Sequence, residues 1–439
     1  MNYSIILYIV GKVMMLEATC FLIPAVTSII YGEHEGLAYL TVGVVAAVIG
    51  YLISSKKKFE HVFFAREGFV MVALSWIVLS VVGAIPFVVT GEIPNMIDAL
   101  FETVSGFTTT GASILEDVES LSHTSLIWRS FTHWVGGMGV IVLLLAILPM
   151  AGGYNMHLMK AESPGPVVGK LVPRLRDTAK ILYLIYLVMT VIEFVILVII
   201  KMPVFDALCI TFGTAGTGGF GIKADSIGSY SYAIQVVVTI FMILFGVNFN
   251  AYFVLLGKHK KEAFKIEEVR WYFGIIFAAI LIITVNIRGY FDNILIALNH
   301  AAFQVGSIIT TTGYSTTDFD RWPQLSRNIL IFLMMCGACA GSTGGGLKVS
   351  RIVVMVKSAF QEIGYYIHPR GVKTIKMDGK VLEKPVLNSI RVFLITYVMI
   401  YTISMFLLSL NNFDFETNFT AIAATFNNIG PGLAKVGPM

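Results

Sequence analysis

The sequence predicts an all-α membrane protein in which one pore-forming unit is repeated four times. Three observations lead to this fold class. The chain of 439 residues is 56% hydrophobic and 13% charged, whereas a typical soluble domain carries about 25% charged residues. Several apolar stretches reach the length of about 20 residues that a helix needs to cross a bilayer. Shorter apolar stretches recur between them, and each ends in a glycine-containing turn.

Nine stretches are long enough to be spans. They lie near residues 5–30, 36–54, 67–90, 126–150, 180–202, 232–256, 271–288, 327–358 and 390–410. The shorter segments are 98–108, 206–215, 293–309 and 416–427. The clearest of these are too short to cross a bilayer, which favours re-entrant half-helices. The eighth long stretch is too long for one helix, and its glycines predict a break.

The basic residues predict the orientation of the chain. Connections 55–66, 151–180, 257–270 and 348–384 hold 22 of the 31 lysines and arginines, and the opposite connections hold three. Cytoplasmic loops carry the excess of these residues in membrane proteins. We therefore expect the N-terminus in the cytoplasm and all four short segments on the outer side.

The four turns align on a central glycine, and the central glycines are 108, 94 and 117 residues apart. Turn 1 is Thr109, Thr110, Gly111 and Ala112; turn 2 is Thr217, Gly218, Gly219 and Phe220; turn 3 is Thr311, Thr312, Gly313 and Tyr314; turn 4 is Asn428, Ile429, Gly430 and Pro431. Each short segment follows a long span and, in the first three units, precedes another. The repeating unit is therefore span, half-helix, glycine turn, span.

The ends of the half-helices indicate what the turns bind. Counting back 13 residues from each central glycine places Asp98, Asp206, His300 and Thr417 at the half-helix starts, with Glu416 beside the last. Carboxylates suit a helix N-terminus, and the opposite end, which points at the turn, carries partial negative charge. Carbonyl oxygens of converging turns replace the hydration shell of an ion, and such hard ligands suit alkali cations. We predict a cation-selectivity filter rather than four ordinary loops.

A glycine-rich segment interrupts the eighth stretch. It comprises Gly341, Ser342, Thr343, Gly344, Gly345, Gly346 and, after Leu347, Lys348. It resembles a phosphate-binding loop but fails the required spacing, because Leu347 separates Gly346 from Lys348. We interpret it as a gate beneath the filter, with a packing kink as the alternative, and expect the third unit alone to have a broken second helix.

Other function classes are less well supported. A secondary transporter of a small organic solute usually has two discontinuous helices in paired halves, not four matched turns. The sequence shows no nucleophile and base set for an enzyme, and its net charge of +4 is weak for nucleic-acid binding. Glu193 lies inside a predicted span, where either a transport role or structural pairing with Asn248 or Asn250 stays open.

Several segments, in order along the chain, resemble one known family. They are Phe107 with the first turn, Trp128 and Arg129, residues 134–142 and 146–150, residues 161–166, and residues 368–370. On these segments the sequence is similar to the Trk/Ktr/HKT family of potassium transporters, and within it to the membrane subunit of the bacterial Trk system. The resemblance covers nearly the whole chain.

The resemblance implies passage of K⁺ through the bacterial inner membrane, with K⁺ at the four turns and no covalently bound cofactor. It implies two extra N-terminal helices in 1–55 and pore units 56–152, 153–258, 259–370 and 371–439 around a pseudo-fourfold axis. The family's fourth unit ends in a further span, whereas this sequence stops at Met439, so we expect an incomplete fourth unit.

The resemblance also implies partners and a mode of control. The implied assembly is a homodimer in the lipid bilayer, with one pore per subunit and a cytosolic nucleotide-binding ring of RCK type (TrkA-like). The glycine-rich segment corresponds to the family's intramembrane loop, which obstructs the closed pore. One reliable glycine per turn implies looser discrimination against sodium than in a potassium channel.

Overall fold

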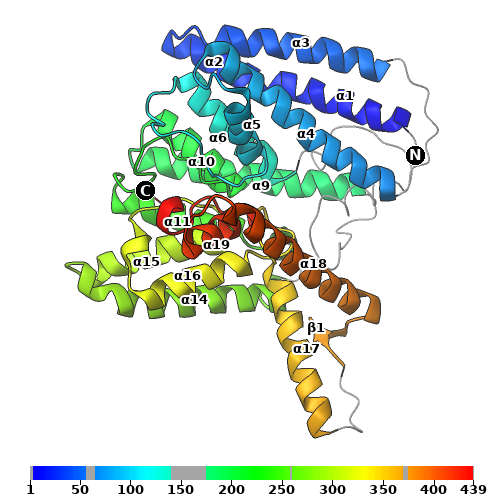
Figure 1. Ribbon diagram of the computed structural model, residues 1–439, viewed down its shortest axis with the longest axis vertical. Coiled ribbons are helices and arrows are strands. Elements are labelled where there is room, and N and C mark those ends of the chain that lie inside the picture. Colours follow the sequence, from blue (N-terminus) through cyan, green and yellow to red (C-terminus); the bar gives the residue numbers. More distant parts are fainter. Residues whose placement is uncertain (1–2, 56–64, 140–174, 258–259, 369–373, 439) are drawn as a thin grey trace. The chain divides into compact units, whose positions relative to one another are not determined.

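The computed structural model describes residues 3–55, 65–139, 175–257, 260–368 and 374–438. Among these residues the only strands are the short hairpin β1 Lys376–Met377 and β2 Lys380–Val381. The described part contains six helices or joined helices that are long and apolar enough to cross a membrane, or seven if one bent pair counts as a span. The prediction of an all-α membrane protein is confirmed (Figure 1).

The described residues form two compact units, the first up to Val238 and the second from Thr239. The helices of the first unit are α1 Tyr3–Cys20, α2 Leu22–Tyr31, α3 Gly36–Ser55, α4 Ala65–Thr90, α5 Met96–Phe107, α6 His123–Gly137, α9 Leu175–Ile199 and α10 Val204–Gly216, followed by the start of α11 Tyr232–Phe245. α1 packs along α3, where Gly11 and Gly50 face each other and let the two backbones approach closely.

Trp128 of α6 lies at the centre of the first unit. It is fully buried against Phe21, Tyr39 and Phe107, and its indole nitrogen donates a hydrogen bond of 3.1 Å to the carbonyl of Gly83. Because Phe107 is the last residue of α5, this aromatic core supports the end of the first half-helix.

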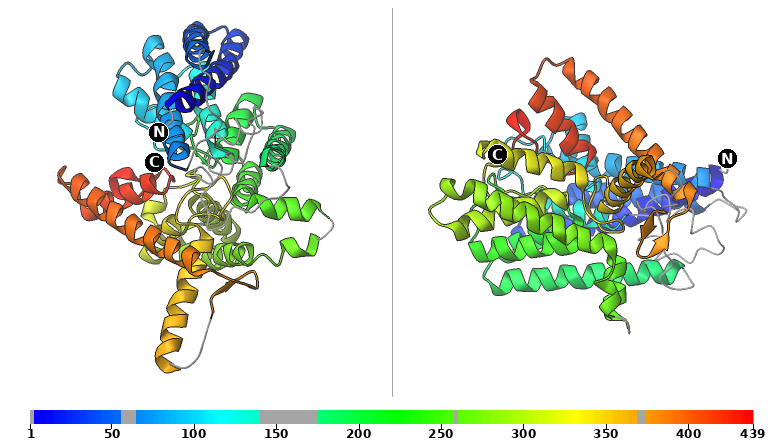
Figure 2. Two further views of the ribbon diagram at one scale, coloured as in Figure 1. Left: turned by 90° about the vertical axis from the view of Figure 1, so that its right-hand side faces the viewer. Right: turned by 90° about the horizontal axis from the view of Figure 1, so that it is seen from below.

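The second unit holds the later elements. Its helices are the rest of α11, α12 Phe249–Leu256, α13 Lys260–Ala263, α14 Glu267–Ile287, α15 Ile294–Ile309, α16 Gln324–Cys336, α17 Val349–Ile367, α18 Lys384–Ser409 and α19 Phe415–Phe426, with short 3₁₀ segments η1 Arg288–Tyr290, η2 Phe319–Arg321 and η3 Ala434–Val436. α14, α15 and α16 pack together around a hydrophobic core. α17 projects away from the other helices of this unit (Figure 2).

The second long helix of the second predicted unit is broken, which the sequence reading missed. The expected span 232–256 is two helices, α11 and α12, that meet at 90°. Gly246 lies at the break, and the side chain of Asn248 accepts a hydrogen bond of 2.9 Å from the amide of Asn250, which starts α12 afresh. The prediction that the third unit alone has a broken second helix is therefore wrong.

The start of the third half-helix was also placed wrongly. α15 begins at Ile294, so His300 lies in its middle and is buried. The side chain of Asn293 caps the helix by accepting a hydrogen bond of 2.9 Å from Leu295. This half-helix has 16 residues, whereas the other three have 12 or 13, so a count of 13 residues back from Gly313 falls short of its start.

Some predictions fall outside the described residues. These are the second half of the span 126–150, the family segments at 140–142, 146–150 and 161–166 and at residues 369 and 370, and the unit boundaries at 56, 152–153, 258–259 and 370–371. The expected division into pore units stays a prediction.

Candidate functional site

All four half-helices end in the same hydrogen-bonded turn. In each, the amide two residues before the central glycine bonds to the carbonyl three residues back, and the next amide bonds to the carbonyl five residues back. The first set is Thr109 to Gly106 (3.1 Å), Thr217 to Thr214 (3.0 Å), Thr311 to Ile308 (3.1 Å) and Asn428 to Thr425 (3.2 Å). The second set is Thr110 to Ser105 (2.8 Å), Gly218 to Gly213 (2.9 Å), Thr312 to Ser307 (2.8 Å) and Ile429 to Ala424 (2.7 Å). This pair of bonds is the Schellman motif.

The backbone angles repeat with the same register. The residue two before the glycine has positive φ in every turn: Thr109 at 58°, Thr217 at 53°, Thr311 at 59° and Asn428 at 56°. The central glycines also have positive φ, between 76° at Gly111 and 94° at Gly430. Threonine is β-branched and rarely adopts positive φ, which costs about 1–3 kcal/mol and is concentrated at functional sites. The alternating angles hold the carbonyls of each turn in one repeated geometry.

Within each of the two compact units, two turns touch at equivalent positions. In the first unit, a Cβ on Gly111 would collide with the carbonyl oxygen of Gly218. In the second unit, a Cβ on Gly313 would collide with the carbonyl oxygen of Ile429. In both cases the central glycine of one turn faces the residue just before the central glycine of the next. Close approach, together with positive φ, therefore requires glycine at these two positions.

The remaining positions of the turns differ for local reasons. Turn 2 has Gly218 where turns 1 and 3 have threonine, because a Cβ there would collide with the ring of His133. The same ring stacks on Phe220 at a centroid distance of 4.2 Å. Tyr314 is fully buried, and its carbonyl accepts a hydrogen bond of 2.6 Å from Ser307.

Three of the four half-helices carry an acidic residue in their first turn. Asp98, Asp206 and Glu416 lie in the first turns of α5, α10 and α19, and Asp414 caps α19 by accepting a hydrogen bond of 2.9 Å from Thr417. The negative end of each helix dipole therefore faces its turn, as the sequence predicts.

The glycine-rich segment lies in the break between α16 and α17. Two backbone bonds of 3.0 Å, from Cys339 to Gly246 and from Phe249 to Gly341, tie it to the break between α11 and α12. These contacts join two non-helical segments of backbone, which supplies each with the hydrogen-bond partners that membrane depth demands.

The same segment touches the third turn. The amide of Gly345 donates a hydrogen bond of 2.6 Å to the side-chain oxygen of Thr311, and a Cβ on Gly345 would collide with the carbonyl oxygen of Asn427, just before turn 4. Lys348 is buried, and its ammonium donates to the carbonyl of Gly344.

A carboxylate that sequence reasoning missed holds both ends of the segment. Glu268, in the first turn of α14, is buried and accepts hydrogen bonds from the amides of Ala340 (2.7 Å) and Ser350 (3.1 Å). It also accepts a bond of 3.5 Å from the side chain of Asn248. Asn248, expected as one possible partner of Glu193, is thus a cap that contacts Glu268. The sequence signal that could have identified Glu268 is an acidic residue at the edge of an apolar stretch.

A buried ion pair behind turns 1 and 2 was also missed. Glu102 of α5 and Arg129 of α6 are 1% and 2% exposed, and their closest atoms are 2.6 Å apart. Each is a charged residue inside a mostly apolar segment, which is the signal that could have found them. No cluster of three metal-ligating side chains occurs among the described residues.

The family model described as "TrkH: Cation transport protein" matches residues 39–437. Among curated relatives, the protein named "Trk system potassium uptake protein TrkH" of Salmonella typhimurium is 37% identical over 446 residues, covering 99% of this chain and 92% of the relative. The Escherichia coli K12 protein of the same name is 38% identical with the same coverage. The protein named "Trk system potassium uptake protein TrkG" of Escherichia coli K12 is 32% identical over 438 residues, covering 98% and 90%.

A solved structure agrees with these relatives. The crystal structure of the potassium transporter TrkH from Vibrio parahaemolyticus superposes with a TM-score of 0.90 at 33% identity, covering 99% of this chain and 92% of that one. Sequence coverage and backbone geometry therefore lead to the same assignment. This chain belongs to the TrkH family of cation transport proteins.

Proposed function

We propose that this chain moves K⁺ across the bacterial inner membrane through a pore and is not an enzyme. The relatives described above are named as potassium uptake proteins. The observation that carries the proposal is the identical pair of hydrogen bonds and the identical positive φ in all four turns. Such repetition, at positions where threonine is strained, is hard to explain by packing of ordinary loops.

The four turns, residues 109–112, 217–220, 311–314 and 428–431, form the selectivity filter in this proposal. Their carbonyl oxygens, supplemented by threonine hydroxyls, replace the water around the ion. K⁺ is the cargo, and no covalently bound cofactor takes part. The pore units at 56–152, 153–258, 259–370 and 371–439 follow the two helices within 1–55 and surround one axis.

Transport and selectivity together test this function. The chain is expected to restore growth on low potassium to a strain that lacks its own potassium uptake systems, and to carry K⁺ in proteoliposomes. Gly313→Ala is expected to abolish discrimination between K⁺ and Na⁺, because the methyl group collides with Ile429 and φ is 90°. Gly274→Ala is the control, since no atom lies within 4 Å of the added Cβ. Selectivity that survives in Gly313→Ala would remove turn 3 from the filter.

The glycine-rich segment 341–346 with Lys348 is the gate in this proposal. Its bond to Thr311 and its anchoring by Glu268 support a position directly against the third turn. Because the segment has few side chains and is held at its two ends, it can change conformation without unfolding a helix.

Control and assembly complete the proposal. The functional unit is a homodimer with the N-terminus in the cytoplasm, regulated by an RCK-type nucleotide-binding ring (TrkA-like). The relatives' names assign them to a "Trk system". Residues 348–384 contain eight lysines and arginines and continue directly from the gate, which favours this segment as the docking site of the ring.

One observation favours a second candidate, a secondary transporter of a small organic solute. Two helices are broken, between α11 and α12 and between α16 and α17, and such transporters bind substrate at broken helices. Growth rescue that depends on potassium separates the two candidates.

A further inference from the structure

The first two turns share a buried charged contact. The guanidinium of Arg129 and the carboxylate of Glu102 pair through two contacts, Nε to Oε1 at 2.7 Å and a second nitrogen to the same oxygen at 2.6 Å. Both side chains are almost completely buried. A buried ion pair contributes little net stability, because desolvation offsets the attraction. Its presence beside the turns therefore calls for a role other than stability.

The carboxylate of this pair holds the segment that leaves turn 1. Glu102 accepts hydrogen bonds from the hydroxyl of Ser113 at 3.0 and 3.1 Å and from the amide of Ile114 at 3.1 Å. Arg129 donates to the same Ser113 hydroxyl at 3.3 Å. Ser113 is two residues beyond Gly111, so these bonds restrain the outlet of turn 1.

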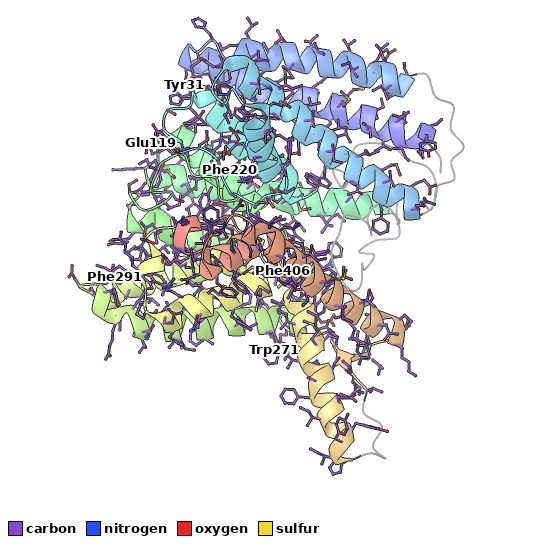
Figure 3. All side chains as sticks on the ribbon, viewed as in Figure 1. Tyr31, Glu119, Phe220, Trp271, Phe291 and Phe406 are labelled. Atoms are coloured by element: carbon purple, nitrogen blue, oxygen red, sulfur yellow. The ribbon has the colours of Figure 1, made fainter. Side chains whose placement is uncertain are left out.

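The guanidinium of the pair holds the segment that leaves turn 2. Arg129 donates to the carbonyl of Gly221 at 3.3 Å, two residues beyond Gly219. Its guanidinium carbon lies 4.1 Å from the ring centroid of Phe220, the last residue of turn 2. Phe220 is labelled among the helices of the first unit (Figure 3). One ion pair therefore restrains equivalent points of two neighbouring turns.

The second unit uses a neutral group at the corresponding place. Gln304 stands nine residues before Gly313, as Glu102 stands nine residues before Gly111. Gln304 is fully buried, and its amide nitrogen lies 3.5 Å from the carbonyl of Thr317. The charged restraint thus distinguishes turns 1 and 2 from a neutral arrangement at turn 3.

We propose that Glu102 and Arg129 are positioning residues that fix the spacing of turns 1 and 2 and so set how strictly the pore selects K⁺ over Na⁺. The inference rests on the proposed function, because it assigns to these residues control over the same filter. Neither side chain contacts the ion; both act through the backbone that follows each central glycine.

The test reconstitutes the purified whole chain into proteoliposomes of equal size. It compares the K⁺/Na⁺ flux ratios of the wild type and the variants. Ser113→Ala removes the hydroxyl that bonds to both Glu102 and Arg129 and leaves the ion pair between them in place. Arg129→Lys keeps the charge but cannot supply the fork of donors that reaches both Glu102 and Gly221. We expect the ratio to fall by about tenfold in Arg129→Lys, the order expected for lost hydrogen bonds to a charged group, and to fall less in Ser113→Ala.

A matched control uses an ion pair of the second compact unit. Asp320→Asn weakens the 2.9 Å contact with Arg327, which keeps its second partner Glu416, and the flux ratio is expected to stay at the wild-type value. If the ion pair only stabilised the fold, Arg129→Lys would lower the amount of folded protein, and the K⁺/Na⁺ flux ratio of the protein that does fold would stay unchanged.

The outcomes separate this inference from the proposed function. If the wild-type chain carries no K⁺, the proposed function fails. If the wild type is selective and folded Ser113→Ala and Arg129→Lys keep its K⁺/Na⁺ ratio, the inference alone is overturned. If Arg129→Lys does not fold, an unchanged ratio in Ser113→Ala overturns it and a lowered ratio supports it.

Discussion

The side-chain oxygen of Thr311 accepts a hydrogen bond of 2.6 Å from the backbone amide of Gly345. Thr311 has positive φ and belongs to turn 3, whereas Gly345 belongs to the glycine-rich segment. This bond therefore connects the proposed filter to the proposed gate. Any movement of the segment away from turn 3 has to break it.

Replacing Thr311 by valine removes the acceptor but keeps the β-branched shape. An amide left without a partner costs about 1–3 kcal/mol, so we expect Thr311→Val to raise K⁺ flux about fivefold or more in the absence of the regulatory ring. Thr217→Val is the matched control, because the hydroxyl of Thr217 donates a hydrogen bond of 2.7 Å to the carbonyl of its neighbour Gly216. Equal basal flux in both variants would show that the bond does not hold the gate.

Glu268→Gln is expected to raise basal flux as well. The amides of Ala340 and Ser350 both donate to Oε1 of Glu268, and an uncharged glutamine oxygen binds them more weakly than a carboxylate does. The glutamine nitrogen also cannot accept the bond that Asn248 donates to Oε2. The adjacent Glu267→Gln serves as control, since Glu267 pairs with Lys357 rather than with the segment. Rubidium uptake into proteoliposomes measures both, and a leak in Glu267→Gln as large as that in Glu268→Gln would contradict the anchor role.

Shortening the glycine-rich segment provides a third test of the gate. Deletion of Gly344 and Gly345 removes the donor to Thr311 and the acceptor for Lys348. We expect higher ion flux without activation by a partner. Unchanged basal flux in proteoliposomes would mean that 341–346 is a packing kink.

The stability of the folded protein is expected to depend on pH through the carboxyl group of Glu33. Partial burial raises the pKa of this carboxyl, but hydrogen bonds from Thr124 and His123 outweigh burial and lower the pKa below 4.5. A lowered folded-state pKa adds stability that is present above the unfolded pKa and is lost as pH falls through the folded value. Thermal unfolding in detergent should therefore lose more stability in the wild type than in Glu33→Gln as pH falls below about 4.3, the ordinary pKa of a glutamate, toward the lower folded-state pKa. Parallel losses would exclude this contribution.

Turn register could be predicted because the signal is local. A glycine with a threonine or asparagine two residues earlier follows every short apolar segment, and the structure shows the same bonds at each. His300 was placed wrongly because helix starts depend on small capping side chains such as Asn293, which resemble ordinary loop residues in a sequence.

The break between α11 and α12 could not be predicted from its own residues. Gly246 alone is tolerated in a helix at a cost of about 1 kcal/mol relative to alanine. What makes the break stable is a partner nearly a hundred positions later: the amide of Cys339 bonds to the carbonyl of Gly246, and Gly341 accepts from Phe249. Contacts of such separation leave no periodic pattern in the sequence.

The all-α membrane class, the four half-helices and the alignment of their turns follow from the residues alone, because hydrophobic length and glycine position act within one segment. Which charges are paired inside the protein depends on the folded arrangement. Glu102 meets Arg129, and Glu268 meets the ends of the glycine-rich segment, because burial permits a charge only where folding brings its partners to it.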